Sequence, residues 1–545
     1  MQEPQQQQPQ QRNPINPVIK KIKAYLGYQG YSIFKDTLTV EEQHALRKEL
    51  TVGAYIPKSP IQPIPFPIYR ESPLKLYVPR YFGLEKWAGI QVESKISPGH
   101  AISLKFMGDL RDYQQVIVEK YLKAARNSGI GGAAIGGGGL LDVDPGKGKT
   151  VMALKIIECL ATKTLVVVHK SFLSNQWKER IEQFLPGARV GIIQGQLIDT
   201  DNKDIVIAMV QSLSMKEYPQ STFESFGLTI FDECHHMGAE VFSRCMMKVT
   251  TTYTLGLSGT MQRKDGLSKV FKMFLGDVVH KEKAESDHCV LVKGINYVVD
   301  DDEFNEVEYD YRGNPKFSTM ISKLCNYNRR SEFIVEVVIK ELQHNADQQI
   351  MILAHNKSLI QYLFKAIEHR KIATVGYYLG GMKEADLKAS ESKKIIIATY
   401  AMASEGLDIK TLTTLIMATP KTDVCQSVGR ILRVKHTTPV VIDIVDAHDL
   451  FKNQWQKRKS YYKKQNYMII VTDSGLYHSN ETNGCWTTAY NPKKIKGAGA
   501  VVAIATGTAG DDEDEGDDDD DDDTGALTKY NSNRKQPILS GKCFL

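Results

Sequence analysis

Short apolar runs rich in Val, Ile and Leu recur along the chain, and segments long enough to form helices separate them. Apolar runs of this kind are typical of strands that are buried on both faces of a parallel sheet. The strands predicted in the first half are Thr164–Val168, Ile205–Met209, Leu228–Phe231 and Thr254–Leu257. After a polar stretch the alternation resumes, with predicted strands at Ile350–Leu353, Ala373–Tyr378, Lys394–Ala398, Thr414–Ala418 and Val440–Ile444. The pattern therefore predicts an α/β fold with two tandem parallel-sheet domains.

The segments around these two domains differ from them in composition. Residues 1–17 are rich in Gln and Pro, and residues 506–545 are rich in Gly, Ala and Asp, so both ends are expected to be disordered. Many aromatic residues and prolines in residues 18–105 predict a small, extended accessory domain. The remaining boundaries that we expect are 106–285 for the first α/β domain, 286–326 for a linker or insertion, 327–467 for the second α/β domain and 468–505 for a C-terminal extension.

Two elements are expected at the end of the second α/β domain. A helix from about Leu450 to Tyr467 carries the basic residues Lys457, Arg458, Lys459, Lys463 and Lys464. We interpret them first as an exposed face and second as a nucleic-acid contact. The stretch from Met468 to Cys485 predicts a short hairpin around Asp473-Ser-Gly475.

Charge and composition narrow the class of protein. The chain has 545 residues and a formal charge of +5, which becomes +17 when the twelve acidic residues between positions 511 and 523 are left out. A basic excess of this size favours a polyanionic partner, although a scattered, solvated surface would also account for it. The eight cysteines include no Cys-x-x-Cys pair, which argues for free thiols and against zinc. With neither a signal peptide nor a long apolar run in the sequence, we expect a soluble intracellular protein without membrane contact.

The stretch Leu140–Thr150 joins a predicted strand to a predicted helix through the turn Pro-Gly-Lys-Gly-Lys-Thr. Glycines let backbone N–H groups close on phosphate oxygens, and a following helix N-terminus adds partial positive charge. The sequence thus predicts a phosphate cradle of Gly146, Lys147, Gly148, Lys149 and Thr150, in which Lys149 can reach the β- and γ-phosphates and Thr150 can hold Mg²⁺. The alternative is an ordinary glycine-rich turn, and Val143 stands where the strict spacing has glycine.

An acidic pair follows a later predicted strand. Asp232 and Glu233 come directly after Phe231, at the sheet edge where a parallel sheet binds its ligands. Asp232 can share the Mg²⁺ with Thr150, and Glu233 can orient and deprotonate an attacking water. We do not expect Cys234 and the two histidines after it to bind a metal. The cradle and the acidic pair together predict hydrolysis of a nucleoside triphosphate.

These motifs resemble those of superfamily 2 helicases of the DExH type, which implies two RecA-like domains with ATP and Mg²⁺ between them. In this family Leu110-Arg-Asp-Tyr-Gln114 is similar to the element that reads adenine, which makes Gln114 the candidate. His235 is the expected coupling residue of the second motif. Ser258 and Thr260 belong to the matching third motif, in which Gly259 replaces the usual alanine, and they are implied to couple ATP to strand binding.

The second α/β domain supplies the remaining family motifs. Ser404-Glu-Gly-Leu-Asp408 resembles the fifth motif, which assigns a coupling role to Glu405 and Gly406 and a nucleotide contact to Asp408. The stretch from Gln426 to Arg433 resembles the sixth motif. The resemblance implies that Gln426, Arg430 and Arg433 act at the γ-phosphate, with the two arginines as arginine fingers.

The resemblance also implies nucleic-acid contacts. Family positions that face the sugar-phosphate backbone match Lys170, Gln211, Ser212, Asn356 and Lys357. Arg263 and Asp265 match an element that bears on strand separation. Each of these residues could instead serve as a helix cap or loop residue. The neighbouring Trp177 is expected to pack in the core.

Within the superfamily, the third and sixth motifs are similar to those of the XPB group and its relatives in phages and large DNA viruses, including the poxvirus transcript-release helicase. The resemblance favours DNA over RNA, a transcription or repair setting with a partner in the transcription machinery, and a location in the nucleus, virion or virus factory. Three alternatives stay open: an RNA-directed helicase, a translocase on double-stranded DNA that separates no strands, and a non-catalytic scaffold.

Overall fold

The computed structural model describes most of the chain between residues 22 and 492. The described residues are 22–55, 62–126, 136–144, 146–234, 237, 239–259, 265–281, 290–405, 409–429, 431–432, 439–478 and 486–492. Both ends that were expected to be disordered lie outside these residues. Within the described part of the chain, no helix is long and apolar enough to cross a membrane.

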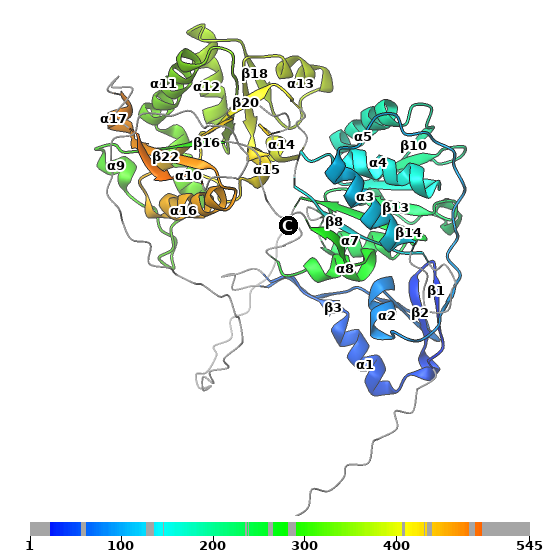
Figure 1. The fold of residues 1–545 in the computed structure, drawn as a ribbon. Coiled ribbons are helices and arrows are strands. Elements are labelled where there is room, and N and C mark those ends of the chain that lie inside the picture. Colours follow the sequence, from blue (N-terminus) through cyan, green and yellow to red (C-terminus); the bar gives the residue numbers. More distant parts are fainter. Residues whose placement is uncertain are drawn as a thin grey trace, which may run out of the picture. The chain divides into compact units, whose positions relative to one another are not determined.

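The N-terminal segment forms a five-stranded sheet, and not the extended structure that its composition suggested (Figure 1). In sheet order its strands are β5 (Arg70–Glu71), β6 (Lys75–Val78), β2 (Gly30–Phe34), β1 (Ala24–Gly27) and β7 (Glu93–Ser94). The other elements are η1 (Lys35–Thr37), α1 (Val40–Glu49), α2 (Arg80–Lys86) and the small sheet of β3 (Thr51–Val52) and β4 (Phe66–Pro67). Leu26, Ile33 and Leu76 of the three central strands are buried. Leu26 pairs with Tyr31, two residues before Ile33, and Ile33 pairs with Leu76, so the three side chains share one apolar face of the sheet.

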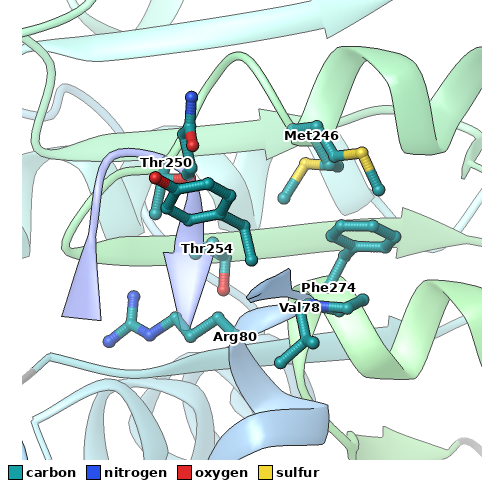
Figure 2. A pocket seen from close by; sticks show the side chains of 11 residues that line it. Val78, Arg80, Met246, Thr250, Thr254 and Phe274 are labelled. Atoms are coloured by element: carbon teal, nitrogen blue, oxygen red, sulfur yellow. The ribbon is translucent and has the colours of Figure 1, made fainter. Parts of the chain in front are cut away.

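This apolar face shares one hydrophobic core with the first α/β domain. Arg80, which is 3% exposed, donates hydrogen bonds from Nη1 to the carbonyl oxygens of Thr251 (2.9 Å) and Thr252 (3.0 Å). The hydroxyl of Tyr81 lies 2.8 Å from that of Thr254. Figure 2 shows the pocket left at this junction, about 10 Å³ in volume, which is lined in part by Val78, Arg80, Met246, Thr250, Thr254 and Phe274. Its volume is that of about one water, so the two domains are closely packed here.

The first α/β domain is an eight-stranded sheet with helices around it (Figure 1). Its strands, in sheet order, are β11 (Leu197–Asp199), β10 (Val190–Gln194), β12 (Ile205–Met209), β9 (Thr164–Val168), β13 (Leu228–Phe231), β14 (Tyr253–Ser258), β8 (Gly138–Asp142) and β15 (Val278–Lys281). Neighbouring strands run parallel except β10 and β11. Its helices are α3 (Asp112–Ala125), α4 (Lys149–Leu160), α5 (Ser171–Phe184), α6 (Val210–Met215), η2 (Gln220–Thr222), α7 (Ala239–Met246) and α8 (Ser268–Leu275).

The second α/β domain repeats this architecture. Its strands, in sheet order, are β18 (Val375–Tyr378), β19 (Ile395–Thr399), β17 (Gln349–Ala354), β20 (Leu412–Met417), β21 (Val440–Asp446), β16 (Leu291–Tyr297), β22 (Met468–Asp473) and β23 (Thr487–Tyr490). Among the described strands of this sheet, β22 and β23 pair in antiparallel fashion and the other neighbours run parallel. Its helices are α9 (Asp302–Asn305), α10 (Phe317–Asn326), α11 (Asn328–His344), α12 (Lys357–His369), α13 (Glu384–Glu391), α14 (Tyr400–Glu405), α15 (Cys425–Val428), α16 (Asp449–Lys464) and α17 (Ser474–His478). Two mostly parallel sheets flanked by helices confirm the predicted fold class.

The expected linker contains a strand of the second sheet. β16 lies within residues 286–326 and pairs in parallel with β21 and β22. Lys293 breaks the apolar run of this strand, which hides it from a search for hydrophobic periodicity. The lysine is nevertheless buried, because its ammonium lies 2.7 Å from the carboxylate of Glu341 on α11.

Two expectations for the C-terminal part are also wrong. Ser474 begins helix α17 where a tight hairpin turn was expected, and its hydroxyl is hydrogen-bonded to the backbone of Val298. Arg458, which was assigned to an exposed basic face, is 1% exposed because its guanidinium pairs with Asp443 on β21. Its basic neighbours Lys457, Lys463 and Lys464 are exposed, as expected.

Candidate active site

The predicted phosphate cradle lies between β8 and α4. Gly146 and Gly148 have φ angles of 85° and 81°, in the left-handed region that favours glycine. A Cβ atom on Gly148 would lie 2.4 Å from Nε2 of Gln114, so a larger residue would displace this amide besides straining the backbone. Lys149 and Thr150 then begin α4, whose first-turn N–H groups have no partners within the helix. This geometry fits a bound phosphate group.

Val143, the residue that departs from the strict cradle spacing, faces the core and not the cradle. Its side chain is fully buried in the cluster that contains Met152 and Ala153 of α4. Its backbone N–H donates to the carbonyl of Ser258 (3.0 Å), and its carbonyl accepts from Nζ of Lys149 (3.3 Å). The valine therefore leaves the cradle open, and it connects the cradle to Ser258 of the third motif.

Gln114, the candidate adenine-reading residue, contacts the cradle directly. Its Nε2 donates to the carbonyl of Lys147 (2.9 Å), and its Oε1 accepts from the backbone N–H of Arg111 (3.0 Å). The hydroxyl of Tyr113 donates to the same Lys147 carbonyl (3.0 Å), and the ammonium of Lys147 lies 5.5 Å from the centre of the Tyr113 ring. Tyr113 is thus part of the site, although no pattern in the sequence distinguishes it from other surface tyrosines.

The acidic pair lies beside the cradle lysine. Glu233 has a φ angle of 47°, which is uncommon for a residue other than glycine, and its Oε1 lies 3.2 Å from Nζ of Lys149. Asp232 is 5% exposed. Burial and the neighbouring Glu233 carboxylate raise the pKa of Asp232 to about 6. The three side chains therefore form one charged cluster at the carboxyl end of the sheet.

Trp177 takes part in this cluster. It is 1% exposed and packs in the core, as the sequence predicted. Its indole Nε1–H also donates a 2.8 Å hydrogen bond to Oδ2 of Asp232. A buried tryptophan needs a partner for its N–H group, and this was the signal in the sequence that could have pointed to a second role.

The cluster has the groups that a Mg²⁺ site for ATP needs. Among the residues that the structure describes, no group of three His, Cys, Asp or Glu side chains could hold a metal ion. Mg²⁺ in nucleotide sites usually needs only one or two protein oxygens, because phosphate and water oxygens complete its shell. Asp232 and Thr150 are the side chains that could supply these protein oxygens.

Several expected site residues lie outside the described part of the chain. These are His235, Thr260, Arg263, Gly406, Asp408, Arg430 and Arg433. The backbones of Glu405 and Gln426 are described, in α14 and α15, but their side chains are not. Their roles therefore stay predictions from the sequence.

The nucleic-acid candidates of the first domain lie after β9 and β12, with Lys170 preceding α5 and the other two residues in α6. Burial lowers the pKa of Lys170. Nε2 of Gln211 donates to the carbonyl of His169 (2.8 Å), and the hydroxyl of Ser212 accepts from the N–H of Gly195 (2.9 Å). The side chains of Gln211 and Ser212 thus hold neighbouring loops in place.

The other nucleic-acid candidates also have local roles. Asn356 caps α12 by accepting from the N–H of Ser358 (2.9 Å), and Lys357 is the first residue of this helix. Oδ1 of Asp265 accepts from the N–H of Leu267 (3.1 Å). The structure therefore brings together the predicted ATP-site residues of the first domain, while the nucleic-acid candidates are spread over separate loops and helix starts.

Comparison with known proteins supports the same class. Residues 107–263 match the family described as the res subunit of type III restriction enzymes. A protein of Acanthamoeba polyphaga mimivirus, provisionally named an ATP-dependent RNA helicase, is 36% identical over 447 residues, which cover 80% of this chain and 83% of the relative. A protein of Invertebrate iridescent virus 6 that is provisionally named a helicase is 29% identical over 385 residues, which cover 67% of this chain and 83% of the relative. A relative from African swine fever virus, also provisionally named an ATP-dependent RNA helicase, is 26% identical over 438 residues, with 74% and 84% coverage.

Two parallel-sheet domains, with a glycine-rich strand-to-helix turn beside an Asp-Glu pair in the first, fit the helicase class of ATP-hydrolysing enzymes. The chain belongs to the superfamily 2 helicases of large DNA viruses. Its activity is therefore ATP-dependent.

Proposed function

We propose that this chain is an ATP-dependent helicase or translocase that acts on DNA, with Mg²⁺ as its metal ion. The observation that carries this proposal is the cluster of Lys149, Glu233, Asp232 and Trp177 beside the glycine cradle. Phosphoryl transfer needs little from a protein beyond positioned charge, and this cluster supplies both signs of charge at one sheet edge.

In this proposal each residue of the first domain has one role. Lys149 binds the β- and γ-phosphates, Thr150 and Asp232 hold Mg²⁺, and Glu233 orients the attacking water. The amide of Gln114 gives up its hydrogen bond to the Lys147 carbonyl and binds the adenine base instead. From the second domain, Gln426, Arg430 and Arg433 reach the γ-phosphate, while Asp408 contacts the nucleotide.

The ion pair between Lys149 and Glu233 gives this mechanism an order. At 3.2 Å the two side chains neutralise each other, so Glu233 is a poor base while the pair persists. A phosphate group that enters the cradle offers Lys149 a stronger negative partner. The lysine then leaves Glu233, and the carboxylate, no longer paired with this ammonium, can accept a proton from water.

Trp177→Phe tests the link between the indole and Asp232. Phenylalanine keeps most of the buried ring but removes the N–H donor. Because this donor favours the charged form of Asp232, its loss is expected to raise the pKa of Asp232 further above about 6. Less Asp232 is then ionised at neutral pH. We expect weaker Mg²⁺-dependent ATPase activity at pH 7, partial recovery at pH 8 to 9, and an acidic limb of the pH profile that lies at higher pH.

The matched control for this variant is Trp87→Phe in the N-terminal domain, where the tryptophan packs on Tyr31 far along the chain from the ATP motifs. This control is expected to keep the parent pH profile. A Trp177→Phe protein with the parent profile would show that the indole only fills the core.

The choice of DNA rests on the resemblance to the XPB group. The mimivirus and African swine fever virus relatives are named as RNA helicases, which supports RNA as the second candidate substrate. The basic charge of the chain outside its acidic tail suits either polyanion. A role in transcription, with a partner in the transcription machinery and a location in the nucleus or virus factory, is part of the same proposal.

One experiment separates the candidates. ATP hydrolysis is measured with single-stranded DNA, double-stranded DNA and RNA of equal length, and strand release is followed on duplexes with single-stranded ends. We expect DNA to stimulate hydrolysis more than RNA. A larger effect of RNA would favour the RNA-directed helicase, and hydrolysis on duplex DNA without strand release would identify a translocase. ATP binding without hydrolysis in the presence of each of the three nucleic acids would indicate a non-catalytic scaffold.

A further inference from the structure

A short loop of the second domain, residues 418–424, leads from β20 into α15, the helix that carries Gln426. α15 has only four residues, and the chain beyond it leads to Arg430 and Arg433. A single helical turn cannot define its own direction, because isolated helices of this length are unstable. The preceding loop therefore helps to set the position of the sixth motif, together with the packing of Val428 and Ile431 in the core of the second domain.

Two buried arginines hold this loop by its backbone. Nη1 of Arg330, on α11, donates to the carbonyl of Ala418 (2.8 Å). Nη1 of Arg458, on α16, donates to the carbonyl of Lys421 (2.7 Å). The two contacts lie three residues apart in the loop and come from two different helices, so they fix both its start and its middle.

Each arginine is in turn fixed by a carboxylate of β21. The Nε and Nη2 atoms of Arg458 lie 2.6 and 2.8 Å from the two carboxylate oxygens of Asp443. The same two atoms of Arg330 lie 2.5 and 2.8 Å from those of Asp446. A two-pronged pair of this kind fixes the plane of the guanidinium and therefore the direction of its remaining Nη1 donor. All four side chains are at most 1% exposed.

The loop is also the meeting point of two other motif segments. Thr419 accepts a hydrogen bond at Oγ1 from the backbone N–H of His355 (3.1 Å), and the same hydroxyl lies 2.9 Å from the His355 ring. The Tyr400 hydroxyl donates to the Thr419 carbonyl. His355 precedes Asn356 and Lys357, which match family positions at the sugar-phosphate backbone, and Tyr400 begins α14, which leads into the fifth motif. One loop thus joins three segments that bear helicase motifs.

Stability alone is a weak explanation for the pair of Arg458 and Asp443. Burial raises the pKa of Asp443 although the Arg458 guanidinium lies against it, which indicates that this pair is costly to desolvate. Buried ion pairs can often be replaced by apolar residues of similar size without loss of stability. The Nη1 hydrogen bond to the loop is what an apolar replacement cannot supply.

We propose that Arg458 and Arg330 are positioning residues for ATP hydrolysis, which hold loop 418–424 so that the sixth motif enters the ATP site in the productive geometry. This inference rests on the proposed roles of Gln426, Arg430 and Arg433. Neither Arg458 nor Arg330 touches ATP in this scheme. Both act through the loop.

The test replaces the pair and keeps the core filled. In the full-length chain, Arg458→Met combined with Asp443→Leu removes both charges and the bond to Lys421. We expect kcat of nucleic-acid-stimulated ATP hydrolysis to fall about tenfold or more, because small misplacements of a catalytic group have effects of this size. KM for ATP should stay within about threefold, since the cradle in the first domain is unchanged.

Arg458→Lys serves as the conservative variant. Lysine keeps a positive charge beside Asp443, but its single ammonium cannot hold both carboxylate oxygens and the Lys421 carbonyl. We expect it to remain folded, with a midpoint of thermal unfolding within about 4 °C of the parent, and to lower kcat as well. If the double variant does not fold, this variant decides the question.

The matched control is another buried ion pair of the same domain. Lys293→Met combined with Glu341→Leu removes the ion pair between β16 and α11. The hydrogen bond of this pair joins Lys293 to Glu341 and does not involve the loop. We expect this control variant to keep the kcat of the parent protein. Parent kcat in the folded Arg458 variants, or an equal loss in the control, would overturn the proposal. If the parent chain itself shows no ATP turnover, or if Lys149→Ala keeps it, the proposed function fails instead.

Discussion

Replacing Lys149 by alanine is expected to abolish nucleic-acid-stimulated ATP hydrolysis while the protein stays folded. The ammonium of Lys149 lies 3.2 Å from Glu233 and 3.3 Å from the carbonyl of Val143, at the start of α4. From this position the ammonium can neutralise the β- and γ-phosphates. Loss of one preorganised donor to developing charge typically costs about 10²- to 10³-fold in kcat.

The measurement is steady-state ATPase activity with saturating DNA, together with circular dichroism on heating. Lys155→Ala is the matched control, because Lys155 lies on the same helix and pairs with Glu158 away from the cradle. The control is expected to keep parent activity. Turnover by the Lys149→Ala protein at a rate near that of the parent would refute the assignment of the cradle.

Replacing Glu233 by glutamine is expected to stop hydrolysis and to retain ATP binding. The amide cannot accept a proton from water, and general-base catalysis typically contributes about 10²- to 10⁴-fold. The substitution also removes the negative partner of Lys149, so the lysine is free for phosphate from the start. ATP affinity should therefore equal or exceed that of the parent, which equilibrium binding of a fluorescent ATP analogue would show.

Glu240→Gln is the matched control for this variant. Glu240 lies on α7, a few residues further along the chain, and pairs with Arg244 at the surface. It is expected to hydrolyse ATP at the parent rate. Hydrolysis by the Glu233→Gln protein within about threefold of the parent would assign the base to another group.

The sequence predicted those features that depend on local patterns. The strands at Thr164–Val168, Ile205–Met209 and Leu228–Phe231 have the bounds that the apolar runs predicted, because strands buried on both faces tolerate few polar residues. The cradle was legible for a similar reason, since close approach of a backbone to phosphate demands glycine at fixed positions.

Features that depend on contacts between distant residues could not be read from the sequence. A lysine inside β16 and an arginine on α16 look exposed until their partners, Glu341 and Asp443, are known. The hydrogen bond from Trp177 to Asp232 joins residues 55 positions apart. Each of these contacts is set by the tertiary fold, and no periodicity along the chain records it.

The core shared by the N-terminal sheet and the first α/β domain affects how the chain folds during its synthesis. Leu26 and Ile33 of the N-terminal sheet belong to the same buried cluster as Phe271 and Phe274 of α8. The N-terminal sheet and α2, which packs on it, therefore leave the ribosome some 240 residues before α8, the helix that packs against α2, a delay of roughly 12 to 50 seconds at about 5–20 residues per second. During that interval the side of this core that α8 completes is still open to solvent, so the final packing of the N-terminal sheet waits for synthesis of the first α/β domain.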